Sequence, residues 1–244
     1  DIRGANLQSR LRMKIEIRNS CSDFNSYRAA RVKSLFNPER GDTFALDADI
    51  PGPDEDWQIG VVVGPSGSGK SSIGRALGGG ITDLYAGWPD DAPIVDAIAP
   101  DGDFNVVTGS LAAVGLGDVP SWLRPFKALS NGQQFRAGLA RCLCDPPDVL
   151  VVDEFTSVID RQIAKIGALA FAKTWRRLKG KRAVLLSCHY DILDWIEPDW
   201  VFDTGRGTLT KKAGLASHGN ARPSSSKSGR SIPVTGLCLS RITI

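Results

Sequence analysis

The stretch GPSGSGKS, residues 64–71, follows the short apolar run WQIGVVV of residues 57–63 and leads into the helix-like sequence SSIGRAL. It fits the pattern G-x-x-x-x-G-K-[ST] of a phosphate-binding loop between a buried strand and a helix. The glycines let successive backbone N–H groups point at phosphate oxygens, and the helix N-terminus adds a partial positive charge. A glycine-rich turn that matches by chance is the alternative, and the strand before it and the helix after it argue against that alternative.

Within this loop, Lys70 supplies a positive charge for the β- and γ-phosphates of a nucleotide, and Ser71 supplies a hydroxyl group for Mg²⁺. The pattern therefore predicts a nucleotide and a magnesium ion at this loop. The predicted nucleotide-binding residues are Gly64, Pro65, Ser66, Gly67, Ser68, Gly69, Lys70, Ser71 and Ser72.

Two adjacent carboxylates, Asp153 and Glu154, end the apolar run DVLVVDEF of residues 148–155. Carboxylates at the end of a buried strand are costly unless a cation or a reaction uses them. We interpret Asp153 as a magnesium ligand and Glu154 as the general base that polarises an attacking water. The alternative is a pair of helix-capping acids at a strand exit.

His189 ends another apolar run, RAVLLSCH of residues 182–189. If this strand lies beside the strand of Asp153, His189 reaches the same rim of the sheet, where α/β proteins bind ligands. We interpret His189 as a contact to the γ-phosphate. A histidine with a purely structural role is the alternative.

The stretch LSNGQQFRAGLARCL, residues 129–143, reads as a polar turn followed by an amphipathic helix. Ser130 and Asn131 are good helix N-caps, and apolar residues recur at helical spacing behind them. One interpretation of this polar start is ordinary capping. The other is a helix N-terminus built to meet an anion.

Strand-like runs alternate with helical runs along the chain, which predicts an α/β fold with a mainly parallel sheet. Residues 13–20 and 42–50 alternate like the strands of a small N-terminal antiparallel part, and residues 26–36 fit a helix or a strand. Residues 81–145 hold short apolar segments broken by Gly and Pro, and we expect a short helical lobe there.

Three parts are expected along the 244 residues. Residues 1–12 are expected to be a non-native or disordered leader with no assigned role, and residues 13–210 form the folded domain. Residues 211–244 are rich in Ser, Lys and Arg and lack apolar periodicity, which predicts a disordered tail.

Composition excludes several classes of protein. The net charge is +3, and removing the +7 after Asp203 and the +2 of residues 1–12 leaves −6 for residues 13–203, so there is no direct nucleic-acid signal. No apolar run approaches the roughly 20 residues that cross a bilayer. Five cysteines without CxxC spacing argue against a disulfide framework or a zinc site and favour a cytoplasmic location.

These motifs, in this order, resemble those of the ABC-type ATPases, and the resemblance runs from about Met13 to Leu209. GPSGSGKSS is similar to the Walker A loop, LSNGQ to the family's LSGGQ signature and VLVVDE to Walker B with its catalytic Glu. TSVID, which ends at Asp160, is similar to the D-loop, and SCH to the switch histidine.

The resemblance implies a P-loop NTPase that uses Mg²⁺ to hydrolyse ATP, with Glu154, His189 and Lys70 as catalytic residues. It also implies an ATP-dependent, head-to-tail homodimer whose interface holds two ATP molecules. The signature helix would then meet the γ-phosphate held on the other subunit. The residues implied to complete that site are Ser130, Gly132, Gln133 and Asp160.

Two features depart from the family pattern. No Gln occurs between Ser71 and Gly132, where transporter subunits carry a glutamine that touches Mg²⁺ and the membrane partner. Asp90 or Asp91 is a candidate replacement, and this segment is shorter than in typical transporter subunits. We therefore expect a soluble ABC ATPase that is not a transporter, and the alternative is the nucleotide-binding subunit of a transporter with a separate membrane protein.

The adenine-stacking aromatic of the family has no clear match, and Phe36 and Tyr27 are candidates that could equally pack in the fold. Residues 113–143, 153–161 and 187–203 are similar to a prokaryotic ABC ATPase group joined to a predicted GNAT-type acetyltransferase domain. An acetyltransferase domain and a membrane subunit are accordingly the two candidate protein partners.

Overall fold

The structure, a computed structural model, describes residues 12–20, 26–36, 43–52, 54–77 and 80–212. Residues 1–11 of the predicted leader and residues 213–244 of the predicted tail lie outside the described residues. The expectations for those two segments therefore stay predictions.

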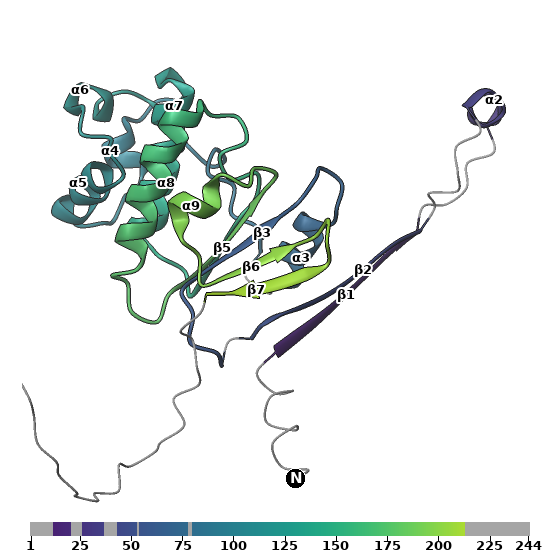
Figure 1. The fold of residues 1–244 in the computed structure, drawn as a ribbon. Coiled ribbons are helices and arrows are strands. Elements are labelled where there is room, and N and C mark those ends of the chain that lie inside the picture. The colour runs from purple at the N-terminus through teal and green to yellow at the C-terminus, as the bar shows by residue number, and fades with distance from the viewer. Residues whose placement is uncertain (1–11, 21–25, 37–42, 53, 78–79, 213–244) are drawn as a thin grey trace, which may run out of the picture.

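A five-stranded sheet with the order β4-β5-β3-β6-β7 forms the centre of the domain (Figure 1). Four strands run parallel, and the edge strand β7 pairs antiparallel with β6. This confirms the predicted α/β class with a mainly parallel sheet. The strands are β3 (Ile59–Val63), β4 (Val149–Val152), β5 (Arg182–Ser187), β6 (Trp200–Asp203) and β7 (Thr208–Lys211).

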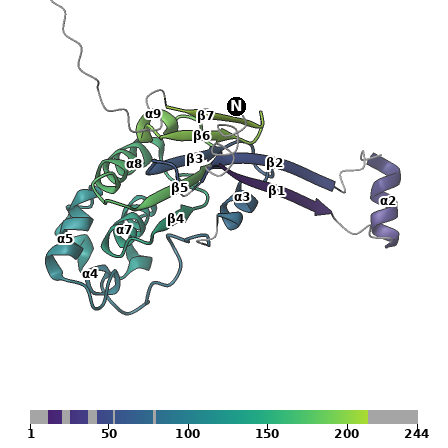
Figure 2. The ribbon, with the colours of Figure 1, turned by 90° about the horizontal axis from the view of Figure 1, so that it is seen from below.

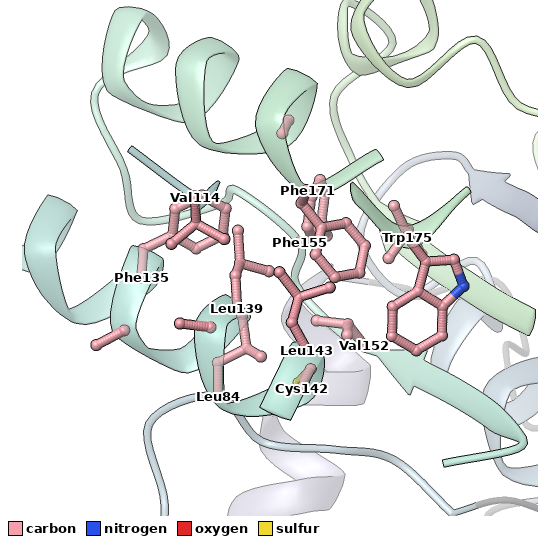
Figure 3. Packing of buried hydrophobic residues seen from close by; sticks show 14 of the residues in the cluster. Leu84, Val114, Phe135, Leu139, Cys142, Leu143, Val152, Phe155, Phe171 and Trp175 are labelled. Atoms are coloured by element: carbon pink, nitrogen blue, oxygen red, sulfur yellow. The ribbon is translucent and has the colours of Figure 1, made fainter. Parts of the chain in front are cut away.

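Successive residues of the central strands serve two different cores, because side chains alternate between the faces of a sheet. On one face, Leu150, Val152 and Leu185 pack against α7 (Asn131–Cys144) and α8 (Arg161–Trp175). Figure 3 shows Phe135, Leu139 and Leu143 of α7 near Phe155 and Phe171 in this core. Apolar runs that are buried on both faces explain why these strands read as continuous hydrophobic stretches.

The other face of the sheet carries Val62, Val151 and Val184, which pack with Ile73 of α3 (Lys70–Ala76). An N-terminal antiparallel pair, β1 (Arg12–Ser20) with β2 (Thr43–Pro51), completes this second core. Four apolar residues of the pair are buried there: Ile15, Ile17, Ala48 and Ile50. The predicted antiparallel part is therefore a separate two-stranded sheet laid on the main one.

Residues 26–36, left open between helix and strand by the sequence, contain α2 (Tyr27–Phe36). Figures 1 and 2 place α2 at the far end of the β1–β2 hairpin, away from α3 and the central sheet. Tyr27, at the start of α2, is 82% exposed. Because the hairpin carries α2 away from the phosphate-binding loop, this arrangement does not support Phe36 or Tyr27 as the adenine-stacking aromatic, and that assignment stays a prediction.

A lobe of short helices lies between α3 and β4 in the chain, as predicted, and it carries the signature helix α7. Its other members are α4 (Ile94–Ala97), α5 (Phe104–Ala113), α6 (Val119–Trp122) and the 3₁₀ helix η1 (Phe126–Ala128). Phe126 stacks on Trp88 with ring centroids 4.4 Å apart, and Arg141 of α7 lies over the same indole. Aromatic stacking thus ties the irregular segment before α4 to the helices that follow.

The folded part extends two residues into the predicted tail. Lys211 ends β7 and forms an ion pair with Glu55, and the Lys212 amide donates to the Asp199 carbonyl at 2.9 Å. The sequence placed the boundary at Thr210 because the basic residues there looked like the start of the tail. Antiparallel pairing with β6 extends the ordered chain past that point.

Candidate functional site

The phosphate-binding loop lies between β3 and α3, the context that its sequence pattern requires. Gly67 and Gly69 have φ of +76° and +87°, and Gly69 is the N-cap of α3. Side chains rarely adopt this left-handed backbone, so these two positions need glycine. A glycine-rich turn that matched the pattern by chance would not need a buried strand before it and a helix after it, and this loop has both.

Lys70, the first residue of α3, is only 7% exposed. Its ammonium group donates to the Gly64 carbonyl at 2.9 Å and to the Pro65 carbonyl at 2.8 Å. A buried charge is costly without such partners. The ammonium group therefore lies inside the turn of the loop, next to Gly64 and Pro65, and a positive charge there fits the binding of phosphate groups.

Thr204, directly after β6, holds this loop from the neighbouring strand, and it belongs to no sequence motif. Its hydroxyl donates to the Val63 carbonyl at 3.1 Å and lies 2.5 Å from the Ser68 hydroxyl. The Ser68 hydroxyl also donates to the Pro65 carbonyl at 2.7 Å. The Ser68 side chain, predicted to contact nucleotide, thus takes part in hydrogen bonds within the loop.

Asp153 and Glu154 follow β4, next to β5 in the sheet. The Glu154 amide donates to the Asp153 carboxylate at 2.9 Å, and Glu154 itself has φ of +51° and is exposed. Neither carboxylate caps a helix, because the N-cap of the following helix α8 is Asp160. The helix-capping alternative for this pair is therefore wrong.

His189 follows β5, which pairs with β4 on one side and with β3 on the other. Because the three strands are parallel, their carboxyl ends meet at one edge of the sheet. The expected adjacency of the His189 strand and the Asp153 strand is confirmed. The His189 amide donates to the Ser187 hydroxyl at 3.1 Å, and its side chain is partly exposed.

The start of α7 forms a complete capping box. The Ser130 amide donates to the Gln133 side chain at 3.0 Å, and the Gln133 amide donates to the Ser130 hydroxyl at 3.4 Å. The Gln133 side-chain amide also donates to Ser121 at 2.7 Å. Ordinary capping therefore accounts for part of this motif, and the anion-binding interpretation stays a prediction.

Gly132 and Asp160 also contribute to helix packing and helix capping within the single chain. A Cβ at Gly132 would lie 2.8 Å from Cγ2 of Ile163, so the glycine allows α7 and α8 to pack closely. The Asp160 carboxylate accepts hydrogen bonds from the Gln162 and Ile163 amides at 2.9 and 3.3 Å. Among the described residues, no hydrogen bond or ion pair joins these motif residues to the phosphate-binding loop.

Asp83 lies closer in register to Asp153 than the acids that the sequence suggested. Thr82 forms an isolated parallel bridge with Val152, so the residues that follow them, Asp83 and Asp153, are neighbours in register. Asp90 instead pairs with Lys127 at 3.2 Å, within the helical lobe. The short stretch ITD gave too little periodicity to be recognised as an added strand position.

The donor set fits magnesium bound mainly through nucleotide and water. No group of three or more His, Cys, Asp or Glu side chains within the described residues is arranged to hold a metal ion. Mg²⁺ commonly takes only one or two protein ligands and fills its shell with phosphate oxygens and water. The Ser71 hydroxyl and the Asp153 carboxylate are the ligands that this arrangement offers.

Within the described residues, no helix is long and apolar enough to cross a membrane.

Comparison with known proteins finds similarity to ATP-binding proteins of import systems. The chain is 33% identical over 159 residues to the zinc import ATP-binding protein ZnuC of Jannaschia sp., which covers 55% of this chain and 63% of that protein. It is 30% identical over 159 residues to ZnuC of Paracoccus denitrificans, covering 56% and 60%. The chain thus spans about three fifths of these relatives. No protein-family model matches it.

The fold is that of a solved ATP-binding cassette. The dimeric, post-hydrolysis structure of the cassette MJ0796 with ADP and phosphate matches with a TM-score of 0.58 at 14% identity, covering 82% of this chain and 98% of that one. The acetyltransferase domain that the sequence suggested as a candidate partner has no support among these relatives and structures. In sequence and in fold, the chain is thus similar to ABC-type nucleotide-binding cassettes.

Proposed function

We propose that this chain binds ATP with Mg²⁺ and hydrolyses it to ADP and phosphate, as the nucleotide-binding subunit of an ABC transport system. One arrangement supports the proposal above all others. The phosphate-binding loop, the Asp153–Glu154 pair and His189 follow three neighbouring parallel strands, so they share one edge of the sheet.

Each residue has a role that its position allows. Lys70 exchanges the carbonyls of Gly64 and Pro65 for phosphate oxygens when the nucleotide enters. Ser71 and Asp153 hold Mg²⁺, which screens the charge of the phosphates. Glu154 accepts a proton from the attacking water, and His189 donates a hydrogen bond to the γ-phosphate.

The signature residues complete the site in a second copy of the chain. Ser130 is the N-cap of α7 and Gly132 lies in its first turn, and a helix N-terminus favours an anion. Among the described residues, no hydrogen bond joins either residue to the loop of its own chain. Gln133 lies in the first turn of α7 and Asp160 is the N-cap of α8, and we propose that both belong to the same half-site as Ser130 and Gly132. We propose that ATP joins two copies head to tail, an arrangement supported by the dimeric state of the similar cassette.

The relatives favour a transport role over the non-transporter role that the sequence first suggested, because both are named as import ATP-binding proteins. One observation keeps the non-transporter role as a second candidate, namely the lack of Gln between Ser71 and Gly132. An acetyltransferase partner is not part of the proposal. Purification from native membranes separates the two roles: a bound multi-span membrane protein supports transport, and a free ATPase supports the second candidate.

Phosphate release by the purified chain tests the activity. Lys70→Ala removes a charge-assisted contact of about 1.5–3 kcal/mol, so we expect ATP affinity to fall roughly ten- to a hundredfold. Glu154→Gln keeps the shape but loses the base, so turnover should fall by about 10²–10⁴ while ATP still binds. Lys173→Ala, an exposed lysine of α8, is the control. Normal affinity in Lys70→Ala, or normal turnover in Glu154→Gln, would overturn the proposal.

A further inference from the structure

Two loops at the sheet edge carry the residues that act on the γ-phosphate. Residues 153–160 follow β4 and contain Glu154 and Asp160, and residues 188–191 follow β5 and contain His189. The relative position of the two loops decides whether the proposed base, Glu154, and the proposed γ-phosphate contact, His189, reach the same phosphate. Because hydrolysis depends on geometry at the level of about 1 Å, whatever holds these loops together affects turnover.

The side chain of Arg161, the first residue of α8, bridges the two loops. Its Nε donates to the Asp191 carboxylate at 3.0 Å, and its Nη2 makes a second bond to the same carboxylate. Its Nη1 donates at 3.2 Å to both the carbonyl and the hydroxyl oxygen of Thr156. One guanidinium thus binds the loop after β4 and the loop after β5 at once.

The guanidinium is also held from a third side. Its carbon atom lies 4.8 Å from the ring centroid of Trp195 in α9 (Ile192–Ile196), a cation–π distance. A planar group with five donors in a fixed fork can satisfy a carboxylate, a carbonyl and a hydroxyl together, whereas an ammonium group cannot present that fork. The arrangement therefore requires arginine rather than any positive charge.

The Thr156 end of the bridge is strained. Thr156 is 2% exposed and has φ of +67°, a conformation that is rare for a β-branched residue. Glu154, two residues earlier, also has positive φ. Strained backbone persists only where surrounding contacts hold it. Arg161 supplies two of those contacts, so it helps fix the turn on which Glu154 stands.

The neighbouring contacts run between the same two loops. The Phe155 amide donates to the Leu186 carbonyl at 2.9 Å, and the Ser187 hydroxyl donates to the Phe155 carbonyl at 3.0 Å. The Ser187 hydroxyl in turn accepts from the His189 amide. These bonds join the two loops close to the ends of β4 and β5, and Arg161 joins the same loops through Thr156 and Asp191.

We propose that Arg161 is a positioning residue, which through Asp191 and Thr156 holds the Glu154–Asp160 loop in register with the His189 loop. Among the described residues, its side chain forms hydrogen bonds with Asp191 and Thr156 and with no residue of the phosphate-binding loop. This inference rests on the proposed ATPase function. It predicts a defect in turnover that leaves ATP affinity in place.

The test compares Arg161→Gln, Arg161→Lys, Asp191→Asn and the double variant Arg161→Gln/Asp191→Asn with Lys173→Gln, which removes a charge from the exposed side of α8. We expect kcat to fall roughly ten- to a hundredfold in Arg161→Gln, with KM for ATP within about twofold. Arg161→Lys should recover little of the loss. The double variant should be no slower than the slower single variant, because both lose the same bridge.

Hydrogen–deuterium exchange of the nucleotide-free proteins provides a readout that needs no activity. Arg161→Gln should speed exchange in residues 153–160 and also in residues 188–191, while the phosphate-binding loop exchanges as before. Normal kcat, a full recovery in Arg161→Lys, or faster exchange confined to residues 153–160 would overturn the inference. A wild-type chain that does not hydrolyse ATP would refute the proposed function instead, and the exchange pattern would still decide whether Arg161 joins the loops.

Discussion

The hydroxyl of Thr204 occupies the place where a side chain at Gly64 would begin. A Cβ built on Gly64 would lie 2.0 Å from Thr204 Oγ1, and Gly64 has φ of +150°. The end of β6 and the start of the phosphate-binding loop are thus in direct contact. The loop is shaped by a residue 140 positions later in the chain, through parallel pairing of β3 with β6.

Thr204→Val should weaken ATP binding without unfolding the protein. The substitution keeps the size of the side chain but removes the hydroxyl that donates to the Val63 carbonyl and lies 2.5 Å from the Ser68 hydroxyl. A net hydrogen bond is worth about 1 kcal/mol, so we expect affinity to fall about fivefold per bond lost. Titration calorimetry measures the change, and Thr208→Val in the exposed part of β7 is the control. An unchanged affinity would show that the loop holds its shape without Thr204.

The sequence predicted most of the central sheet because the signals there are local. Apolar runs such as IGVVV at residues 59–63 must be buried on both faces, and GPSGSGKS must follow such a strand. The position of Thr204 could not be predicted in this way. It depends on which strand pairs with β3, and strand order is a property of the whole chain.

The same distinction explains the residues that the sequence misplaced or missed. Phe36 and Tyr27 lie near the loop only if the N-terminal segment folds back, and the β1–β2 hairpin carries them outward instead (Figure 2). Arg161 and Asp191 meet across 30 positions and match no motif. Asp83 follows Thr82, whose isolated bridge to Val152 aligns this segment with the strand that leads to Asp153.

Gly132→Ala should destabilise the folded chain even in the absence of nucleotide. The added methyl group would clash with Ile163, and overpacking of this kind costs about 1–3 kcal/mol. Ile163→Ala in the same chain should remove part of that cost, because it clears the contacting atoms. Urea unfolding of Gly132→Ala, Ile163→Ala and the double variant measures these free energies.

A matched control for Gly132 lies in the same lobe. Gly109 in α5 has no atom within 4 Å of a built Cβ, so Gly109→Ala should stabilise the helix by up to about 1 kcal/mol. Equal effects of Gly132→Ala and Gly109→Ala on the free energy of unfolding would contradict the packing role of Gly132. The role of this glycine would then lie in nucleotide contact alone.

The Cys142 thiol should resist labelling in the folded protein. Burial raises its pKa from 9.0 to about 11. A raised pKa favours the neutral thiol, so at pH 8 the reactive thiolate fraction is roughly a hundredfold lower than for an ordinary thiol. A variant with Cys142 as its only cysteine tests this with a chromogenic thiol reagent. Labelling should be slow in buffer and fast in urea, and rapid labelling in buffer would show that the C-terminal part of α7 opens readily.

The proposed function depends most on the claim that ATP joins two copies of this chain through the loop of one and the signature of the other. Light scattering of Glu154→Gln with ATP and Mg²⁺ tests that claim directly, because loss of the base should trap the bound state. We predict that the mass doubles with ATP and not with ADP, and that adding Ser130→Arg abolishes the doubling while each chain still binds ATP. A Glu154→Gln chain that binds ATP and stays monomeric would contradict the account.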